Sequence, residues 1–110
     1  MSLANVIAPP ERYSDVALSA GSGCTITENN SQIQGNLVII EFVVSVNTNL
    51  SGTPVLATLD DYVVDKGKLL SVVGVSDTYA YTQTGANTIR LRQGVSQGTT
   101  VIVWGVITVA

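Results

Sequence analysis

Turn-forming residues recur about every ten positions along this chain and separate short segments that are rich in β-branched residues. The connections contain Gly, Asn, Asp or Ser, which tolerate tight-turn geometry. No segment repeats apolar residues at the spacing of a helix. Since 37 of the 110 residues are Val, Ile or Thr, strands are favoured over helices. The sequence therefore predicts an all-β protein, built as one antiparallel β-sandwich or jelly-roll-like domain of about 8–9 short strands.

The turn residues also set the expected limits of the strands and of the domain. Pro9 and Pro10 favour an extended backbone, so residues 1–12 are expected to be a lead-in and residues 13–110 the domain. A chain of 110 residues is too short for a second domain with its own core. Strands are predicted at residues 14–19, 24–28, 32–34, 36–46, 54–59, 69–75, 78–83, 88–92 and 100–109.

Composition excludes several classes of function. The net charge of −3 argues against nucleic acid as a partner, and the absence of His removes the commonest acid–base group and most zinc sites. No phosphate-binding, dinucleotide or nucleophile motif is present, so neither an enzyme nor a cofactor is predicted. The single Cys24 is expected to be a small buried residue. The longest apolar stretch, residues 37–44, is too short to insert into a membrane as a helix.

Two long strands are apolar on both faces, at residues 36–46 and 100–109. An antiparallel sheet with one wet face would alternate apolar and polar residues instead. Both faces are therefore expected to be covered, the second by another copy of the chain, through Phe42, Val44, Ile102, Trp104 and Val106. Two alternatives remain: one face is simply an exposed surface with little charge, or the only tryptophan, Trp104, serves as a ligand platform.

One hairpin contains the residue types of a saccharide site. Tyr79 and Tyr81 lie two residues apart on one predicted strand, so they share a face. Aromatic rings stack on the C–H faces of sugars while polar groups bind the hydroxyls. Asp77, Asn87 and Arg90 are the predicted polar members of this site. The alternative is that both tyrosines pack in the core or between strands.

Two groups of charged residues have structural and functional interpretations. Glu41 interrupts an apolar strand, where an unpaired carboxylate would be costly, and Arg90 or Arg92 is its expected partner in an ion pair. Asp60, Asp61 and Asp65 could form a calcium loop, but their spacing matches no known loop, and a solvated turn is the preferred interpretation. No metal site is predicted.

The order of features from residue 30 to residue 110 follows a recognisable pattern. The matching pieces are GNLVIIEF at residues 35–42, VLATLDDY at 55–62, TGANTIRL at 84–91 and the apolar strand at 100–109. This order resembles the C-terminal head domain of bacteriophage tail fibres and receptor-binding proteins. The sequence departs from that pattern at Asp60-Asp61-Tyr62, where such heads have a turn that contains proline.

The resemblance implies a head domain that assembles as a homotrimer and binds saccharides of the host cell wall or surface. It also implies a phage or prophage virion protein, located on a tail or capsid surface and made without a signal peptide in the bacterial cytoplasm. A protein of a different class is the alternative: a purely structural virion or assembly protein without a ligand.

Overall fold

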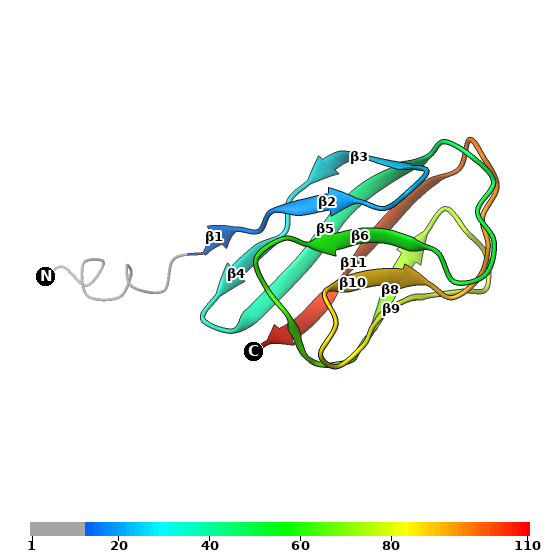
Figure 1. Ribbon diagram of the computed structural model, residues 1–110. Coiled ribbons are helices and arrows are strands. Elements are labelled where there is room, and N and C mark those ends of the chain that lie inside the picture. The colour runs from blue at the N-terminus through cyan, green and yellow to red at the C-terminus, as the bar shows by residue number, and fades with distance from the viewer. Residues whose placement is uncertain (1–12) are drawn as a thin grey trace, which may run out of the picture.

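The computed structural model describes residues 13–110, which form a curled antiparallel β-sheet with no helix (Figure 1). The prediction of an all-β protein is confirmed for this part of the chain. The predicted lead-in at residues 1–12 lies outside the described residues. Within them, no helix is long and apolar enough to cross a membrane.

Eleven strands make up the sheet. They are β1 (Ser14–Asp15), β2 (Leu18–Ala20), β3 (Cys24–Asn29), β4 (Gln32–Gln34), β5 (Leu37–Val46), β6 (Val55–Leu59), β7 (Val64–Lys66), β8 (Leu69–Val73), β9 (Ala80–Thr82), β10 (Thr88–Leu91) and β11 (Thr100–Val109). The main order across the sheet is β1-β4-β5-β11-β8-β9-β10-β6-β2, while β3 pairs with β5 and β7 pairs with β11.

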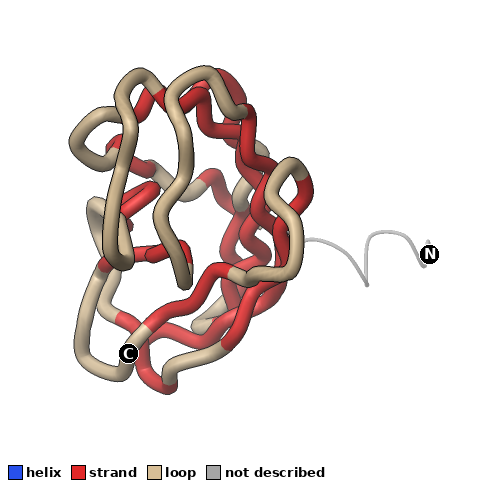
Figure 2. Tube along the Cα trace, turned by 90° about the vertical axis from the view of Figure 1, so that its right-hand side faces the viewer, coloured by secondary structure: helices blue, strands red, loops and turns tan. Residues whose placement is uncertain are grey.

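Strand β8 is where the sheet curls. Its first residues, Leu69 and Leu70, pair with β9, while residues 71–73 pair with β11. One strand therefore joins two halves, which we call the β5–β11 half and the β6–β10 half. Strands β2, β6 and β10 lie in front of β5 and β11 in Figure 1, and Figure 2 shows strands on both sides of a common interior.

The core fills the space between the two halves. Every second residue of β5 and β11 points into it, as the alternation of side chains along a strand requires. The β6–β10 half supplies the facing layer from β6 and β10. The largest fully buried side chains are Phe42, Ile40, Leu56, Leu59, Ile89, Leu91 and Ile107.

The structure corrects part of the predicted subunit interface. Phe42 and Val44 have no exposed surface, because they lie in the core of a single copy, and so they cannot contact another one. The other three predicted residues, Ile102, Trp104 and Val106, alternate with the buried positions of β11 and face outward. In a single copy 51% of the Trp104 side chain is exposed, so this ring is not part of the core.

The outward side of the β5–β11 half is unusually apolar. Register places Ile102 opposite Val43 and Val73, and it places Val106 opposite Ile39. We define the outer apolar face as Leu37, Ile39 and Val43 of β5, Ile102, Trp104 and Val106 of β11, and Val73 of β8. Two carboxylates stand beside these positions, Glu41 opposite Trp104 and Glu28 of β3 opposite Val43.

Two differences between the predicted and the observed number of strands follow from long-range strand pairing. The single strand predicted at residues 14–19 is two strands, because β1 pairs with β4 while β2 crosses to β6. Strand β7 was expected to be part of a turn, yet it pairs with the end of β11 and buries Val64. A strand of three residues depends on such long-range pairing rather than on its own sequence pattern.

Gly74 ends β8 at a close approach between two backbones. Its φ is +106°, and a Cβ atom there would collide with the carbonyl oxygen of Thr100. Only glycine adopts this conformation readily, so the chain leaves β8 at this residue.

Cys24 lies at the start of β3, opposite Val46, where it packs against the core while remaining partly exposed. Its burial is thus less complete than predicted. Burial still raises the pKa of the Cys24 thiol above its ordinary value, because the thiolate is less well solvated there.

Candidate functional site

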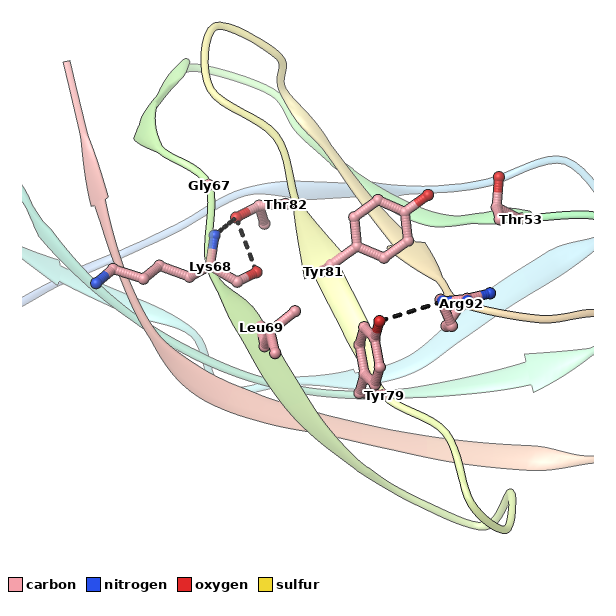
Figure 3. A pocket seen from close by; sticks show the side chains of 8 residues that line it. All are labelled: Thr53, Gly67, Lys68, Leu69, Tyr79, Tyr81, Thr82 and Arg92. Carbon is pink, nitrogen blue, oxygen red and sulfur yellow. Dashed lines mark hydrogen bonds between the residues drawn. The ribbon is translucent and has the colours of Figure 1, made fainter.

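A pocket of about 530 Å³ lies on the outer surface beside β9 (Figure 3). It draws residues from four separate segments: the turn before β6, the β7–β8 connection with the first residue of β8, β9 with the residue before it, and the residue after β10. The residues that line it are Thr53, Gly67, Lys68, Leu69, Tyr79, Tyr81, Thr82 and Arg92. Two of these residues, Tyr79 and Tyr81, belong to the predicted saccharide site.

Strand alternation directs the two tyrosines into the pocket. Ala80 and Thr82 are buried on the inner side of β9, so Tyr79 and Tyr81 project outward from the same face. Both rings are partly exposed, and Figure 3 shows them next to each other along the strand. The alternative that these tyrosines pack in the core is therefore wrong.

Arg92 is the pocket cation closest to the rings. Its backbone N–H donates to the carbonyl of Tyr79 at 3.0 Å, which places the two residues side by side on neighbouring strands. Its Nε donates to the Tyr79 hydroxyl at 3.2 Å. This contact holds the guanidinium beside the phenol ring, at the edge of the pocket (Figure 3).

The predicted ion pair of Glu41 is not formed within the chain. Glu41 is exposed on β5 opposite Trp104, whereas Arg90 and Arg92 lie on or next to β10 in the other half of the sheet. Both arginines donate instead to neutral oxygens. An exposed carboxylate on the outer face retains its water and therefore needs no partner.

Arg90 borders the pocket without lining it. It stands opposite Tyr81 in the β9–β10 pair, but its side chain reaches across to the turn before β6. Its Nη1 donates to the carbonyl oxygen of Thr53 at 2.8 Å. Because Thr53 is part of the pocket wall, this hydrogen bond from Arg90 stabilises that wall.

The β7–β8 connection forms the opposite wall and is tied to β9 by Thr82. The backbone N–H of Lys68 donates to Oγ1 of Thr82 at 3.0 Å. A Cβ atom at Gly67 would lie 2.6 Å from the carbonyl oxygen of Thr82, so only glycine fits this approach. In Figure 3 the Lys68 amine extends away from the tyrosine rings.

Two predicted members of the site lie elsewhere. Asp77 is exposed in the turn after β8, where its φ is +56°, and it is not part of the pocket lining. Asn87 belongs to the β9–β10 turn, and its Nδ2 donates to the carbonyl of Leu59 at 3.5 Å. Asp77 and Asn87 are close to the tyrosines in the sequence, but the pocket is assembled from segments that are farther away along the chain.

The other lining residues were not predicted as site members. Arg92 had a signal in the sequence, since it lies two residues after Arg90 and therefore shares its face. No local pattern in the sequence points to the others. The pairing of β8 with β9 brings Gly67, Lys68 and Leu69 to the tyrosines, and the pairing of β6 with β10 brings Thr53.

Other surface features offer less chemistry. Asp60, Asp61 and Asp65 do not belong to any group of residues within 13–110 that could hold a metal ion. Asp60 instead accepts a hydrogen bond of 2.6 Å from the Ser19 hydroxyl. Two other hollows, of about 520 and 370 Å³, are lined without an aromatic ring.

Comparison with known protein families, curated proteins and solved structures found no match to this chain. The pocket and the outer apolar face are therefore the features that bear on function.

Proposed function

We propose that this protein is a phage or prophage virion protein that binds a host-surface saccharide in the pocket of Tyr79 and Tyr81. The observation that supports binding is the pair of partly exposed rings on one face of a pocket with a cation at its edge. The virion assignment comes from the pattern at residues 35–42, 55–62, 84–91 and 100–109, which resembles phage receptor-binding heads.

The pocket suits recognition rather than chemistry. Its volume falls within the range of roughly 300–1,000 Å³ that is usual for sites of small ligands. The tyrosine rings offer flat apolar surfaces for the C–H faces of a sugar, and the Arg92 guanidinium offers N–H donors for its oxygens. No carboxylate lines this pocket, so the pair of acids used by glycosidases is absent from its lining, and the proposed role is binding without catalysis.

We further propose that the curled sheet is a jelly-roll-like β-sandwich and that three copies assemble through the outer apolar face. Five side chains of large apolar residues on this face remain exposed, and an apolar surface of this kind marks an interaction site. They are Leu37, Val73, Ile102, Trp104 and Val106. A trimer would present three pockets, so that weak single sites would gain by avidity.

The same face supports the second candidate function, a purely structural virion or assembly protein. In that case, the exposed strands would exist for subunit contacts alone, and the pocket would have no ligand. The two candidates differ in one respect that can be measured, which is saccharide binding.

The decisive experiment removes both rings by the double substitution Tyr79→Ala and Tyr81→Ala. Binding to a glycan array and to host cells is compared with that of the unmodified protein, and a thermal melt monitors folding. Tyr13→Ala is the matched control, because this ring is 46% exposed and lies outside the pocket.

We expect the double variant to lose binding while its melting temperature stays near that of the control. The expectation follows from the partial exposure of both rings, whose removal leaves no large cavity in the core. Unchanged binding would reject the pocket as the site. An unmodified protein that binds no glycan would favour the structural alternative.

A further inference from the structure

Three of the four cationic side chains of the described chain lie at this one pocket. The four are Lys66, Lys68, Arg90 and Arg92. Lys68 and Arg92 line the pocket, and Arg90 is hydrogen-bonded to its wall at Thr53. Lys66, on β7, pairs with Thr108 of β11 and does not line the pocket. The chain as a whole has a net charge of −3, so this gathering runs against its overall balance.

Within residues 13–110, no carboxylate is paired with the pocket's arginines or lines the pocket. The seven acidic residues of the described chain are all absent from the pocket lining, and no ion pair joins one of them to either arginine. Among the described residues, the Arg92 side chain makes one hydrogen bond, which its Nε donates to the Tyr79 hydroxyl. A guanidinium has five N–H donors, so the two terminal nitrogens of Arg92 remain available for a ligand.

We infer that the ligand of the pocket is an acidic saccharide, a sugar that bears a carboxylate or phosphate group. This inference rests on the proposed saccharide binding at Tyr79 and Tyr81. The sugar ring would stack on a tyrosine while its oxyanion accepts two parallel hydrogen bonds from Arg92. Carboxylate and phosphate both match the planar fork of arginine, which is why the shared feature is the oxyanion.

Arg92 suits this role better than the other lining cation. Its guanidinium is held beside the rings by the Tyr79 hydroxyl, so less freedom is lost when a ligand binds. The Lys68 amine extends away from the rings in Figure 3. Tyr79 therefore has two functions, as a stacking surface and as a positioning residue for Arg92.

The first test measures affinity by isothermal titration calorimetry with the unmodified protein. The probes are trigalacturonic acid, the same trisaccharide with its carboxyl groups reduced, and a trisaccharide phosphate. We expect an acidic probe to bind at least about tenfold more tightly than the neutral one, as a charge-assisted bidentate contact allows. The affinity of the acidic probe should decrease when NaCl is raised from about 50 to about 500 mM, because salt screens exposed charges.

The second test identifies the residue that binds the negative charge of the ligand. Arg92→Gln is expected to weaken the acidic probe about tenfold or more and to change the neutral probe little. Lys66→Gln is the matched control, because it removes the same charge from a residue that does not line the pocket. Tyr79→Phe keeps the ring and removes the acceptor for Nε, so it should weaken the acidic probe alone.

The outcomes separate this inference from the function on which it rests. Equal affinity for acidic and neutral probes would overturn the inference and leave saccharide binding intact. Equal losses in Arg92→Gln and Lys66→Gln would also overturn it, since the effect would then be one of net charge. Failure to bind any of the probes or any arrayed glycan would remove both. Tighter binding of the carboxylate probe would support the inference and identify a carboxylate as the oxyanion. Tighter binding of the phosphate probe would support it and identify a phosphate.

Discussion

Replacement of Trp104 by serine should separate the copies of the proposed trimer. In a single copy, 51% of the Trp104 side chain is exposed, and it stands between Glu41 and Ser71 on the outer face. A tryptophan buries roughly 150–250 Å² when fully covered, so about 100 Å² remains for a second copy to cover. At about 25 cal/mol per Å², each covered ring contributes about 2.5 kcal/mol to association.

That free energy corresponds to a large change in the dissociation constant. Since about 1.4 kcal/mol is a factor of ten, the loss of one covered ring should weaken association about 60-fold. Sedimentation velocity across a range of concentrations measures this shift directly. Tyr13→Ser is the matched control, because Tyr13 has a similar exposure but lies outside the outer apolar face. It should leave the mass distribution unchanged.

Two results would refute the reasoning. The first is an unmodified chain that sediments as an 11.5 kDa protomer at micromolar concentration. The second is a Trp104→Ser variant whose association curve overlies that of the unmodified protein. A dilute protomer should also lose less than about 1 kcal/mol of stability from this change, because substitutions of exposed residues have small effects.

Two further predictions concern the core and the thiol. Phe42→Ala should lower the free energy of unfolding by about 3–5 kcal/mol in urea titration, because the ring is fully buried; a loss under about 1 kcal/mol would contradict its place in the core. Alkylation of Cys24 by iodoacetamide should accelerate at a higher pH in the folded protein than in urea, since burial raises the pKa of this thiol and the folded state keeps its proton longer. A folded midpoint at or below the unfolded one would disprove that shift.

The long strands could be placed from the sequence because their signal is local. Strand β11 matches its prediction at both ends, and β5 begins one residue later than predicted. Runs of β-branched residues between turn residues are enough to define such strands, whatever they pair with. The short strands β1, β2 and β7 depend on their partners, which explains why their limits or existence were missed.

The pattern of apolar residues did not show which face of β5 and β11 points into the core. Both faces of β5 and β11 are apolar, so alternation alone does not say whether Phe42 or Val43 points inward. Register decides it: Phe42 pairs with Val103 in the core, and Val43 pairs with Ile102 outside. A slip of one residue in this pairing would exchange the two faces of the strand.

The candidate site shows the same division between local and tertiary information. The sequence by itself determined that Tyr79 and Tyr81 share one face, because alternation along a strand is a property of the backbone. Only the tertiary structure decided that this face is the outer one, with Ala80 buried beneath it. The curl at β8 also brings Gly67 and Lys68 to the rings, while Asp77 and Asn87 remain in turns outside the pocket lining. A pocket assembled from four segments depends on strand pairing over long range, and no local pattern of residues encodes that pairing.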